Sequence, residues 1–388
     1  MERFTGLIGV VLILGIAYAM SNNRKAINYR TVGVGLALQF GLAVFILKTT
    51  IGQNIFNWLG KAVQKTLSFS DQGAEFVFSP LVKPSILNKA FGAGNDFIFF
   101  FTIIPTIIFV AVLVNMLYHI GLMQRIVAVL ARLMKWLMGV SGAEALSNVA
   151  SAFVGQVEAQ IMVKPYLKGM TNSELLASMT GSFACIAGGV MATYIKLGVP
   201  APYLIAASLM AAPGALVIAK IVFPETETSE TKGIVKLEIK KSHANLLDAI
   251  AAGASEGLKV GFNVIAMLIG FIALIGLLDY CLGKAGGLFA FPELSLNFIL
   301  GKLFSVFAWA MGVPSKDIEV AGSLMGTKMV INEFVAYSQL TPMITSQVMA
   351  HKSVVIASFA LCGFANFSSI GILGGTFRCR CFWIFNSS

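Results

Sequence analysis

Residues 97–118 form a run of 22 residues without a single charged side chain. Such a run matches the roughly 20 apolar residues that an α-helix needs to cross a bilayer. The whole chain agrees, because 57% of its 388 residues are hydrophobic and only 12% are charged, whereas soluble domains carry about 25% charged residues. A surface this poor in charge does not suit water, so the sequence predicts an all-α polytopic membrane protein.

Several other apolar runs predict further transmembrane segments. The first run is also compatible with a secretory signal peptide, since Ala17-Tyr18-Ala19 resembles a cleavage site, but a transmembrane helix is preferred because a second apolar run follows at once. The basic residues between these two runs predict a cytoplasmic loop and an outside N-terminus. Segments 50–94 and 121–138 have amphipathic spacing and are predicted to lie at the membrane interface. The predicted spans are 4–20, 31–47, 97–118, 175–195, 201–219, 260–278 and 354–373.

The net charge of +10 comes mainly from Lys and Arg residues in short segments between apolar runs. This placement indicates a topology signal and attraction to the lipid bilayer, so no nucleic-acid partner is expected. Three of the five cysteines lie in apolar segments, which argues against a disulfide scaffold. The sequence contains no HExxH, CxxC or Walker-type motif and therefore gives no support for metal-dependent hydrolysis, ATP-driven transport or a cofactor.

Two segments, 142–168 and 314–351, do not make good single spans. Each is apolar overall, is interrupted by glycine and polar residues, and carries a carboxylate in its middle, Glu158 in the first and Glu333 in the second. A carboxylate at membrane depth costs roughly 2.5–3.5 kcal/mol and needs a partner or a function. The segments are predicted to be re-entrant hairpins whose tips reach the middle of the bilayer. Structural pairing of the two carboxylates with Lys164 or Lys328 is the alternative.

Each predicted hairpin is followed by a span with a glycine-rich interruption. Glu158 lies 24 residues before Ser182 of the first interrupted span, and Glu333 lies 25 residues before Ser358 of the second. The spans between the two halves give the second hairpin the opposite orientation. Inverted repeats with broken helices that meet at the midplane are typical of secondary transporters, because unwound backbone is tolerated there only where it lines a cavity.

The polar stretch 224–243 is the best boundary between the halves. The predicted architecture has two inverted repeats, two re-entrant helical hairpins and broken transmembrane helices, divided between a scaffold and a transport domain. The predicted parts are 1–140 (N-terminal helices, interfacial helices and scaffold span), 141–223 (first repeat of the transport domain), 224–313 (cytoplasmic loop, scaffold span and interfacial segment), 314–375 (second repeat) and 376–388 (an atypical tail).

Three motifs carry a resemblance to a known family. They are GQxEA from Gly155, GxKxxxNEFVA from Gly326 and GFANF from Gly363. With these motifs in this order, the chain resembles the concentrative nucleoside transporter family over almost its whole length, to about Gly375. After Gly375 the sequence departs from the last apolar helix of that family, so an altered or truncated end without an eighth transmembrane helix is expected.

The resemblance implies a homotrimer with eight transmembrane helices and a transport domain that moves like an elevator against a scaffold built near 97–118 and 260–278. A ribose diol is a double donor, which suits a carboxylate, and a Gln side chain offers both a donor and an acceptor to a base edge. The residues implied to face the nucleobase, pack on it, bind the ribose or line the pocket are Gln156, Val157, Glu158, Val190, Glu333, Phe364, Asn366 and Ser369.

The resemblance also implies a coupling-cation site at Ser151, Val154, Cys185 and Ile186. Sodium prefers oxygen ligands, as hard cations do. The sodium-coupled members carry Asn in place of Ser151 and Ser in place of Cys185, so this chain lacks an amide oxygen and a hydroxyl at those positions. Proton coupling through Glu158 or Glu333 is the alternative to sodium coupling.

The expected function is therefore cation-coupled import of nucleosides, such as uridine or adenosine, with Na+ or H+, across a bacterial cytoplasmic membrane. Val157 stands where a hydroxyl residue is common in the family, which leaves the preference between purines and pyrimidines open. The alternatives are a secondary transporter of another small polar solute, a passive pore and an intramembrane enzyme. The enzyme is disfavoured because no nucleophile–histidine pair or metal set supports it.

Overall fold

The computed structural model describes residues 5–92, 97–232, 243–288, 291, 293–366 and 369. Throughout these residues the regular structure is helical, as the sequence predicted. Five predicted apolar runs form the helices α1 (Thr5–Ala19), α2 (Tyr29–Lys48), α5 (Phe99–Ile120), α11 (Ala201–Val222) and α12 (Leu246–Leu288).

Among the described residues, five helical segments are long and apolar enough to cross a bilayer: α2, α5, α11, α12 and the interrupted segment Asn172–Leu197. The first predicted span forms α1, whose described part has 15 residues, fewer than the roughly 20 residues of a typical span. The last predicted span begins with α16 (His351–Leu361), and most of its second half lies outside the described residues.

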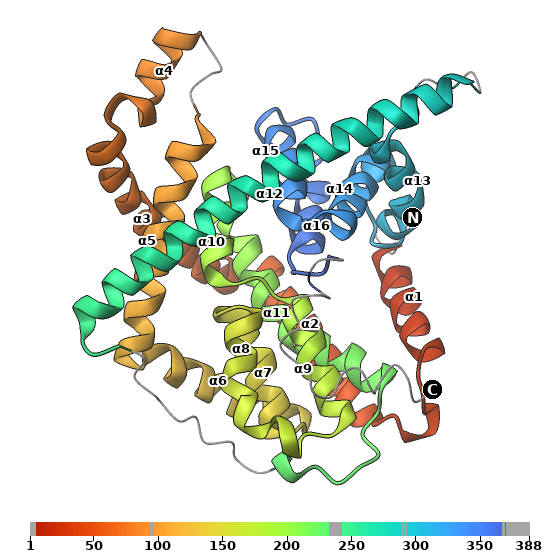
Figure 1. Ribbon diagram of the computed structural model, residues 1–388. Coiled ribbons are helices and arrows are strands. Elements are labelled where there is room, and N and C mark those ends of the chain that lie inside the picture. The colour runs from red at the N-terminus through yellow and green to blue at the C-terminus, as the bar shows by residue number, and fades with distance from the viewer. Residues whose placement is uncertain are drawn as a thin grey trace.

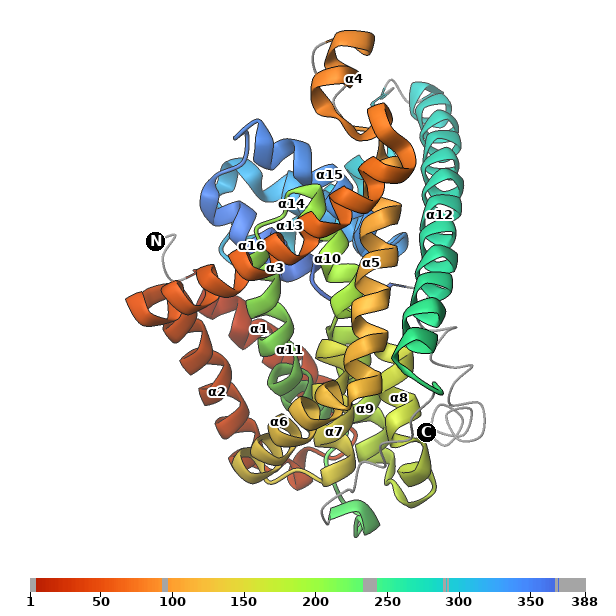
Figure 2. The same cartoon turned by 90° about the vertical axis from the view of Figure 1, so that its left-hand side faces the viewer.

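Helix α12 is much longer than the span predicted over 260–278. It has 43 residues, which at 1.5 Å per residue corresponds to about 65 Å. Charged residues on either side of the predicted span, such as Glu256 and Asp279, limited the apolar window without interrupting the helix. Helix α12 crosses the front of the molecule diagonally in Figure 1 and lies along its right-hand edge, next to α5, in Figure 2.

The segments with amphipathic spacing form the helices α3 (Thr50–Phe78), α4 (Pro84–Phe91) and α6 (Leu122–Met138). Helix α3 contacts α5, α11 and α10 (Gly188–Leu197) and runs across them in Figure 2. The apolar segment that follows α12 forms α13 (Leu296–Ala310). Short 3-10 helices complete the regular structure at Arg24–Ala26, Ser79–Val82, Lys164–Gly169, Glu230–Lys232 and Ser315–Asp317.

Both carboxylate-bearing segments are helical hairpins, as predicted. The first consists of α7 (Gly142–Phe153) and α8 (Gln156–Val163), and the second of α14 (Ile318–Val330) and α15 (Glu333–Thr345). The first hairpin reverses at Gly155, whose φ of +111° suits glycine because it has no Cβ. Figures 1 and 2 show the two hairpins toward opposite ends of the molecule.

The span after the first hairpin is broken into α9 (Asn172–Ala184) and α10 (Gly188–Leu197). Helix α9 begins with a capping box, since the backbone N–H of Glu174 donates to Thr171 Oγ1 at 3.2 Å and the backbone N–H of Thr171 donates to Glu174 Oε2 at 2.8 Å. In the span after the second hairpin, helix α16 likewise ends early, at Leu361. Both predicted interruptions are therefore present.

The polar stretch 224–243 is described up to Lys232 and holds only one short 3-10 helix there. The tail predicted over 376–388 and the expected departure after Gly375 lie outside the described residues. Two of the apolar cores flank the breaks. One core packs α10, α15 and α16 around the fully buried Tyr194 and Tyr337, and the other packs α7, α8, α9 and α11 around residues such as Leu216.

Candidate functional site

The two helix breaks lie against each other in the middle of the molecule. The backbone N–H of Phe364, after α16, donates to the carbonyl oxygen of Cys185, between α9 and α10, at 3.3 Å. Gly363 has a φ of +149°, and a Cβ at this position would lie 2.9 Å from the carbonyl oxygen of Ala184. Only glycine fits this approach without a shift, so the sequence lets unwound backbone from both repeats meet at one point.

Glu333 sits beside this meeting point, in the first turn of α15, and is only 2% exposed. Its Oε1 accepts a hydrogen bond from Tyr194 Oη at 3.0 Å, and its Oε2 accepts one from Asn366 Nδ2 at 3.3 Å. The N-terminal end of α15 adds a favourable positive dipole. A buried carboxylate is costly without such partners, so the fold holds Glu333 in one orientation.

Asn366 links Glu333 to Ser369. Its Oδ1 accepts hydrogen bonds from the backbone N–H of Ser369 at 2.9 Å and from Ser369 Oγ at 2.8 Å. Glu333, Asn366 and Ser369, which were expected to act together on the ribose, therefore form one connected cluster. Phe364 is half-buried and lies at the meeting point of the breaks.

Lys328, near the end of α14, is also buried and is 9% exposed. Its Nζ donates to the carbonyl oxygen of Ala360 at 3.0 Å, near the C-terminal end of α16, where a positive charge is favourable. Among the described ion pairs, none joins Lys328 to Glu333 or Lys164 to Glu158, so neither carboxylate forms a direct ion pair with these lysines in the described part of the chain.

A cavity of about 220 Å³ opens next to this cluster. One wall comes from the first hairpin, α10 and α15, and includes Glu158, Val190 and Phe334; the other comes from α5 and α12. Glu158 projects from the first turn of α8, with Oε2 2.9 Å from the position that a Cβ of Gly155 would take. Of the eight substrate residues expected from the sequence, Glu158 and Val190 line the cavity.

Gln156 offers a further polar atom at the tip of the first hairpin. Its Oε1 is buried, and no described group donates a hydrogen bond to it. Buried polar atoms are nearly always hydrogen-bonded, so an orphaned acceptor in this position suits a donor supplied by a ligand. Val157, between Gln156 and Glu158, has a side chain outside the described part of the structure.

The four expected cation positions are buried together where α7 and α9 end. Ser151 Oγ donates to the carbonyl oxygen of Ser147 at 2.8 Å and lies 3.1 Å from Ser182 Oγ. Val154 follows the end of α7, and Cys185 and Ile186 follow the end of α9. The C-terminal ends of two helices therefore lie at these positions, and the partial negative charge of a helix C-terminus favours a cation.

Gln160 connects the helices around these positions and was not predicted from the sequence. Its Nε2 donates to Ser147 Oγ at 3.1 Å and to Ser182 Oγ at 2.6 Å, while its Oε1 accepts from Ser178 Oγ at 2.9 Å. Every member of this network is completely buried. Such a satisfied network fixes the relative position of α7, α8 and α9.

The sequence prediction also missed Tyr194, Asn115 and Glu256. Tyr194 lies one helical turn after Val190, so it shares a helix face with a predicted residue, and its buried hydroxyl needed a partner. Glu256 is a charged residue in an otherwise apolar helix, a signal that points to function in membrane proteins. Asn115 became recognisable only once the structure placed it beside Glu256.

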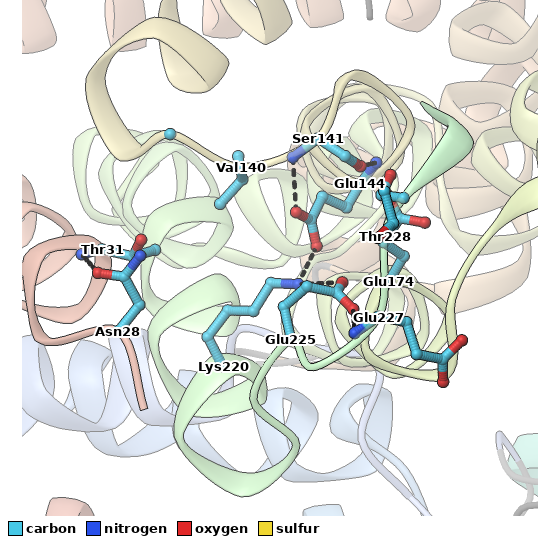
Figure 3. A pocket seen from close by; sticks show the side chains of 12 residues that line it. Asn28, Thr31, Val140, Ser141, Glu144, Glu174, Lys220, Glu225, Glu227 and Thr228 are labelled. Carbon is cyan, nitrogen blue, oxygen red and sulfur yellow. Dashed lines mark hydrogen bonds and ion pairs between the residues drawn. The ribbon is translucent and has the colours of Figure 1, made fainter. Parts of the chain in front are cut away.

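A second cavity, at the far end of α7, α9 and α11, is lined by charged residues (Figure 3). Lys220 and Glu144 form an ion pair there, with Nζ 2.7 Å from Oε2 and with 8% and 2% of the side chains exposed. Lys220 Nζ also donates to Ser173 Oγ at 2.9 Å and lies 3.6 Å from Glu225 Oε2. These interactions join three helix ends.

The loop after α11 closes the same end of the molecule. Glu174 Oε1 accepts hydrogen bonds from Ser229 Oγ at 2.5 Å and from Thr231 Oγ1 at 2.6 Å, and Thr171 Oγ1 donates to Glu225 Oε2 at 2.7 Å. The N-terminus of α9 is therefore held by residues of the loop. We interpret this second cavity as a structural junction and place the functional site at the meeting of the two breaks.

Comparisons with known proteins agree with this geometry. The chain matches profiles described as "Na+ dependent nucleoside transporter N-terminus" over residues 8–81, "Nucleoside recognition" over residues 100–201 and "Na+ dependent nucleoside transporter C-terminus" over residues 203–379. It is 37% identical to the nucleoside permease NupC of Helicobacter pylori over 95% of this chain and 88% of that protein. It is also 37% identical to the rat sodium/nucleoside cotransporter 1, over 96% of this chain and 58% of that protein.

Solved structures give the same result. The structure of CNTnw in an inward-facing substrate-bound state is 40% identical and superimposes with a TM-score of 0.91 over 97% of this chain and 89% of that chain. Structures of CNTnw variants described as outward-facing and intermediate match with the same TM-score. These relatives are transporters and permeases rather than enzymes. The chain belongs to the concentrative nucleoside transporter family, and it is a multi-pass membrane protein.

Proposed function

We propose that this chain is a cation-coupled symporter that imports nucleosides across a bacterial cytoplasmic membrane by alternating access. The observation that carries the proposal is the meeting of two broken helices beside a cavity that holds the carboxylate of Glu158 and adjoins that of Glu333. A site at such a crossing of inverted repeats is the arrangement that secondary transporters use. The family and the printed names of the relatives support a nucleoside as the solute.

The proposed binding roles follow from the hydrogen-bonding capacity of each side chain. Glu333, Asn366 and Ser369 bind the ribose hydroxyls, because hydroxyl groups both donate and accept. Gln156, Val157 and Glu158 face the nucleobase. Val190 and Phe364 pack against the nucleoside.

Tyr194 has a positioning role in this proposal. Its hydroxyl donates to one oxygen of Glu333, while Asn366 donates to the other. Each carboxylate oxygen has two lone pairs, so both oxygens retain acceptor capacity for a ribose hydroxyl. The carboxylate is thus oriented before the substrate arrives, which lowers the cost of ordering on binding.

The proposed moving part is formed by the two repeats, 141–223 and 314–375, and the proposed scaffold includes α5 and α12. In support, the cavity lies between these two groups of helices, and the matching CNTnw structures are described as inward-facing, intermediate and outward-facing states. An elevator movement of the repeats against the scaffold and a homotrimeric assembly belong to the same proposal.

The proposed coupling ion is Na+ or H+. A sodium ion at Ser151, Val154, Cys185 and Ile186 would receive one hydroxyl oxygen and backbone carbonyl oxygens, while the Cys185 thiol supplies sulfur in place of oxygen. Hard cations prefer oxygen. Because this donor set suits sodium only in part, a proton carried by Glu158 or Glu333 is the second candidate for the coupling ion.

The test is uptake of radiolabelled uridine and adenosine by proteoliposomes under separate gradients. We expect saturable accumulation that collapses when the coupling gradient is removed. A sodium gradient at equal pH and a proton gradient without sodium identify the ion. Uptake that only equilibrates, with neither gradient having an effect, would point to a passive pore and contradict the proposal.

A further inference from the structure

The cavity beside the breaks carries a second carboxylate that the assigned site does not use. Glu256 of α12 faces the cavity from the opposite wall to Glu158 of α8. The described lining of this wall is otherwise apolar, apart from Asn115. A charged side chain within an apolar helix is costly and points to a functional role.

The packing of α12 on α5 determines the position of Glu256. A Cβ at Gly253 would lie 2.9 Å from the carbonyl oxygen of Ala111, and a Cβ at Gly257 would lie 2.7 Å from Ile108 Cα. These glycines allow the two helix backbones to approach closely, as small residues do in membrane helix pairs. Glu256 lies between them in the sequence and is therefore fixed on the scaffold.

Asn115 orients the carboxylate of Glu256. Its Nδ2 donates to Glu256 Oε2 at 3.1 Å and to the carbonyl oxygen of Ala111 at 3.0 Å. The amide is thus held by its own helix while it binds the carboxylate. In the described part of the chain, no group donates a hydrogen bond to Glu256 Oε1, which leaves this oxygen available to the cavity.

Glu158 and Glu256 line this cavity from opposite walls. An ionised carboxylate only accepts hydrogen bonds, so neither carboxylate can donate one to the other. A group that donates in two directions suits this arrangement. An exocyclic amino group has two N–H bonds on one nitrogen, so it can donate to both carboxylates at once.

Building on the function proposed above, we propose that Glu256 is a specificity-determining residue that accepts a hydrogen bond from the exocyclic amino group of the nucleobase, opposite Glu158. The ligands favoured are the amino-bearing nucleosides, adenosine and cytidine. Inosine and uridine place a carbonyl oxygen at the corresponding position. The carboxylates of Glu158 and Glu256 accept hydrogen bonds and cannot donate one to this oxygen. A buried acceptor left without a donor lowers affinity.

The test compares matched substrates in the Glu256→Gln variant. A glutamine amide can donate to a carbonyl oxygen as well as accept from an amine. We expect two ratios to fall by about tenfold relative to the unchanged protein: KM for uridine divided by KM for cytidine, and KM for inosine divided by KM for adenosine. A tenfold change corresponds to the contribution of one charge-assisted hydrogen bond. Ratios that stay the same within twofold would overturn the proposal.

Two further variants separate specificity from general damage. Asn115→Ala should raise KM for the amino-bearing nucleosides with little change in kcat, because Glu256 keeps its charge and loses its orientation. Glu75→Gln removes an exposed carboxylate that pairs with Lys83 at 2.6 Å and should leave both ratios unchanged. If Glu256→Gln is poorly inserted into liposomes, the variant is compared in detergent instead. Displacement of bound cytidine by uridine from the purified protein then gives the ratio of the two affinities.

Two other outcomes are distinguishable. An equal change in the sodium or pH dependence for all four nucleosides would show that Glu256 serves a cation, and would overturn the proposal. Absence of uptake and binding of every nucleoside by the unchanged protein would instead reject the proposed function itself. A selective change in the ratios, with the ion dependence unaltered, is the result that the proposal predicts.

Discussion

Replacing Lys220 with methionine should destabilise the protein strongly, because this lysine neutralises a buried carboxylate. Lys220 Nζ lies 2.7 Å from Glu144 Oε2, and Glu144 is only 2% exposed (Figure 3). Without the ammonium group, the backbone N–H of Ser141, at 2.7 Å from Oε1, is the principal remaining partner of the carboxylate. Breaking a buried ion pair by removing one member costs roughly 3–5 kcal/mol.

An exposed ion pair provides the matched control. Lys302 pairs with Glu319, and their side chains are 54% and 63% exposed. Such surface pairs contribute about 0–1 kcal/mol, so Lys302→Met should change the free energy of unfolding by no more than that. The double variant Lys220→Met with Glu144→Gln should recover part of the loss, because it no longer buries an unpaired charge.

The assay is equilibrium unfolding in mixed micelles, followed by intrinsic fluorescence and by retention of the folded peak on size-exclusion chromatography. A difference of about 3 kcal/mol between Lys220→Met and Lys302→Met is expected from the cost of an unpaired buried charge. Two variants that unfold within about 1 kcal/mol of each other would refute the reasoning, since that result would mean that water or another group replaces the ammonium at no cost.

Three further predictions concern the site. Tyr194→Phe should lower kcat/KM for nucleoside uptake by about tenfold, because Glu333 loses one charge-assisted hydrogen bond; a loss below twofold in uptake kinetics would contradict the positioning role. Ser151→Asn combined with Cys185→Ser should increase the sodium response of uptake at fixed pH, since both changes add an oxygen ligand; an unaltered response would remove these positions from the cation site. Gly363→Ala should destabilise the protein by roughly 1–3 kcal/mol in the same unfolding assay, because φ is +149° there, and an unchanged stability would count against the tight crossing of the breaks.

The sequence was sufficient to predict the hairpins because their signal is chemical. A carboxylate is too costly in an apolar segment to occur there without a partner or a function, and both Glu158 and Glu333 mark hairpins in the structure. The breaks after α9 and α16 were likewise predictable from glycine and polar residues within apolar runs. These features depend on local composition and can therefore be read from the sequence alone.

The rest depends on contacts between distant segments. Tyr194 looks like any core aromatic until the fold places it 3.0 Å from Glu333, 139 residues away. The pairing of Asn115 with Glu256 requires the close packing of α5 on α12, and no spacing pattern predicts it. The full length of α12 was missed because charged residues lower local hydropathy without breaking a helix.

Uptake by proteoliposomes that contain Glu333→Ala tests directly whether the crossing of the two repeats binds the transported nucleoside. Glu319→Ala, which removes an exposed carboxylate from α14, is the matched control. We expect the unchanged protein and Glu319→Ala to accumulate uridine or adenosine against the concentration gradient of the nucleoside. Glu333→Ala should lose at least about 100-fold in kcat/KM, as expected for the loss of two charge-assisted hydrogen bonds. Uptake by Glu333→Ala at the rate of the control would contradict binding of the nucleoside at this crossing.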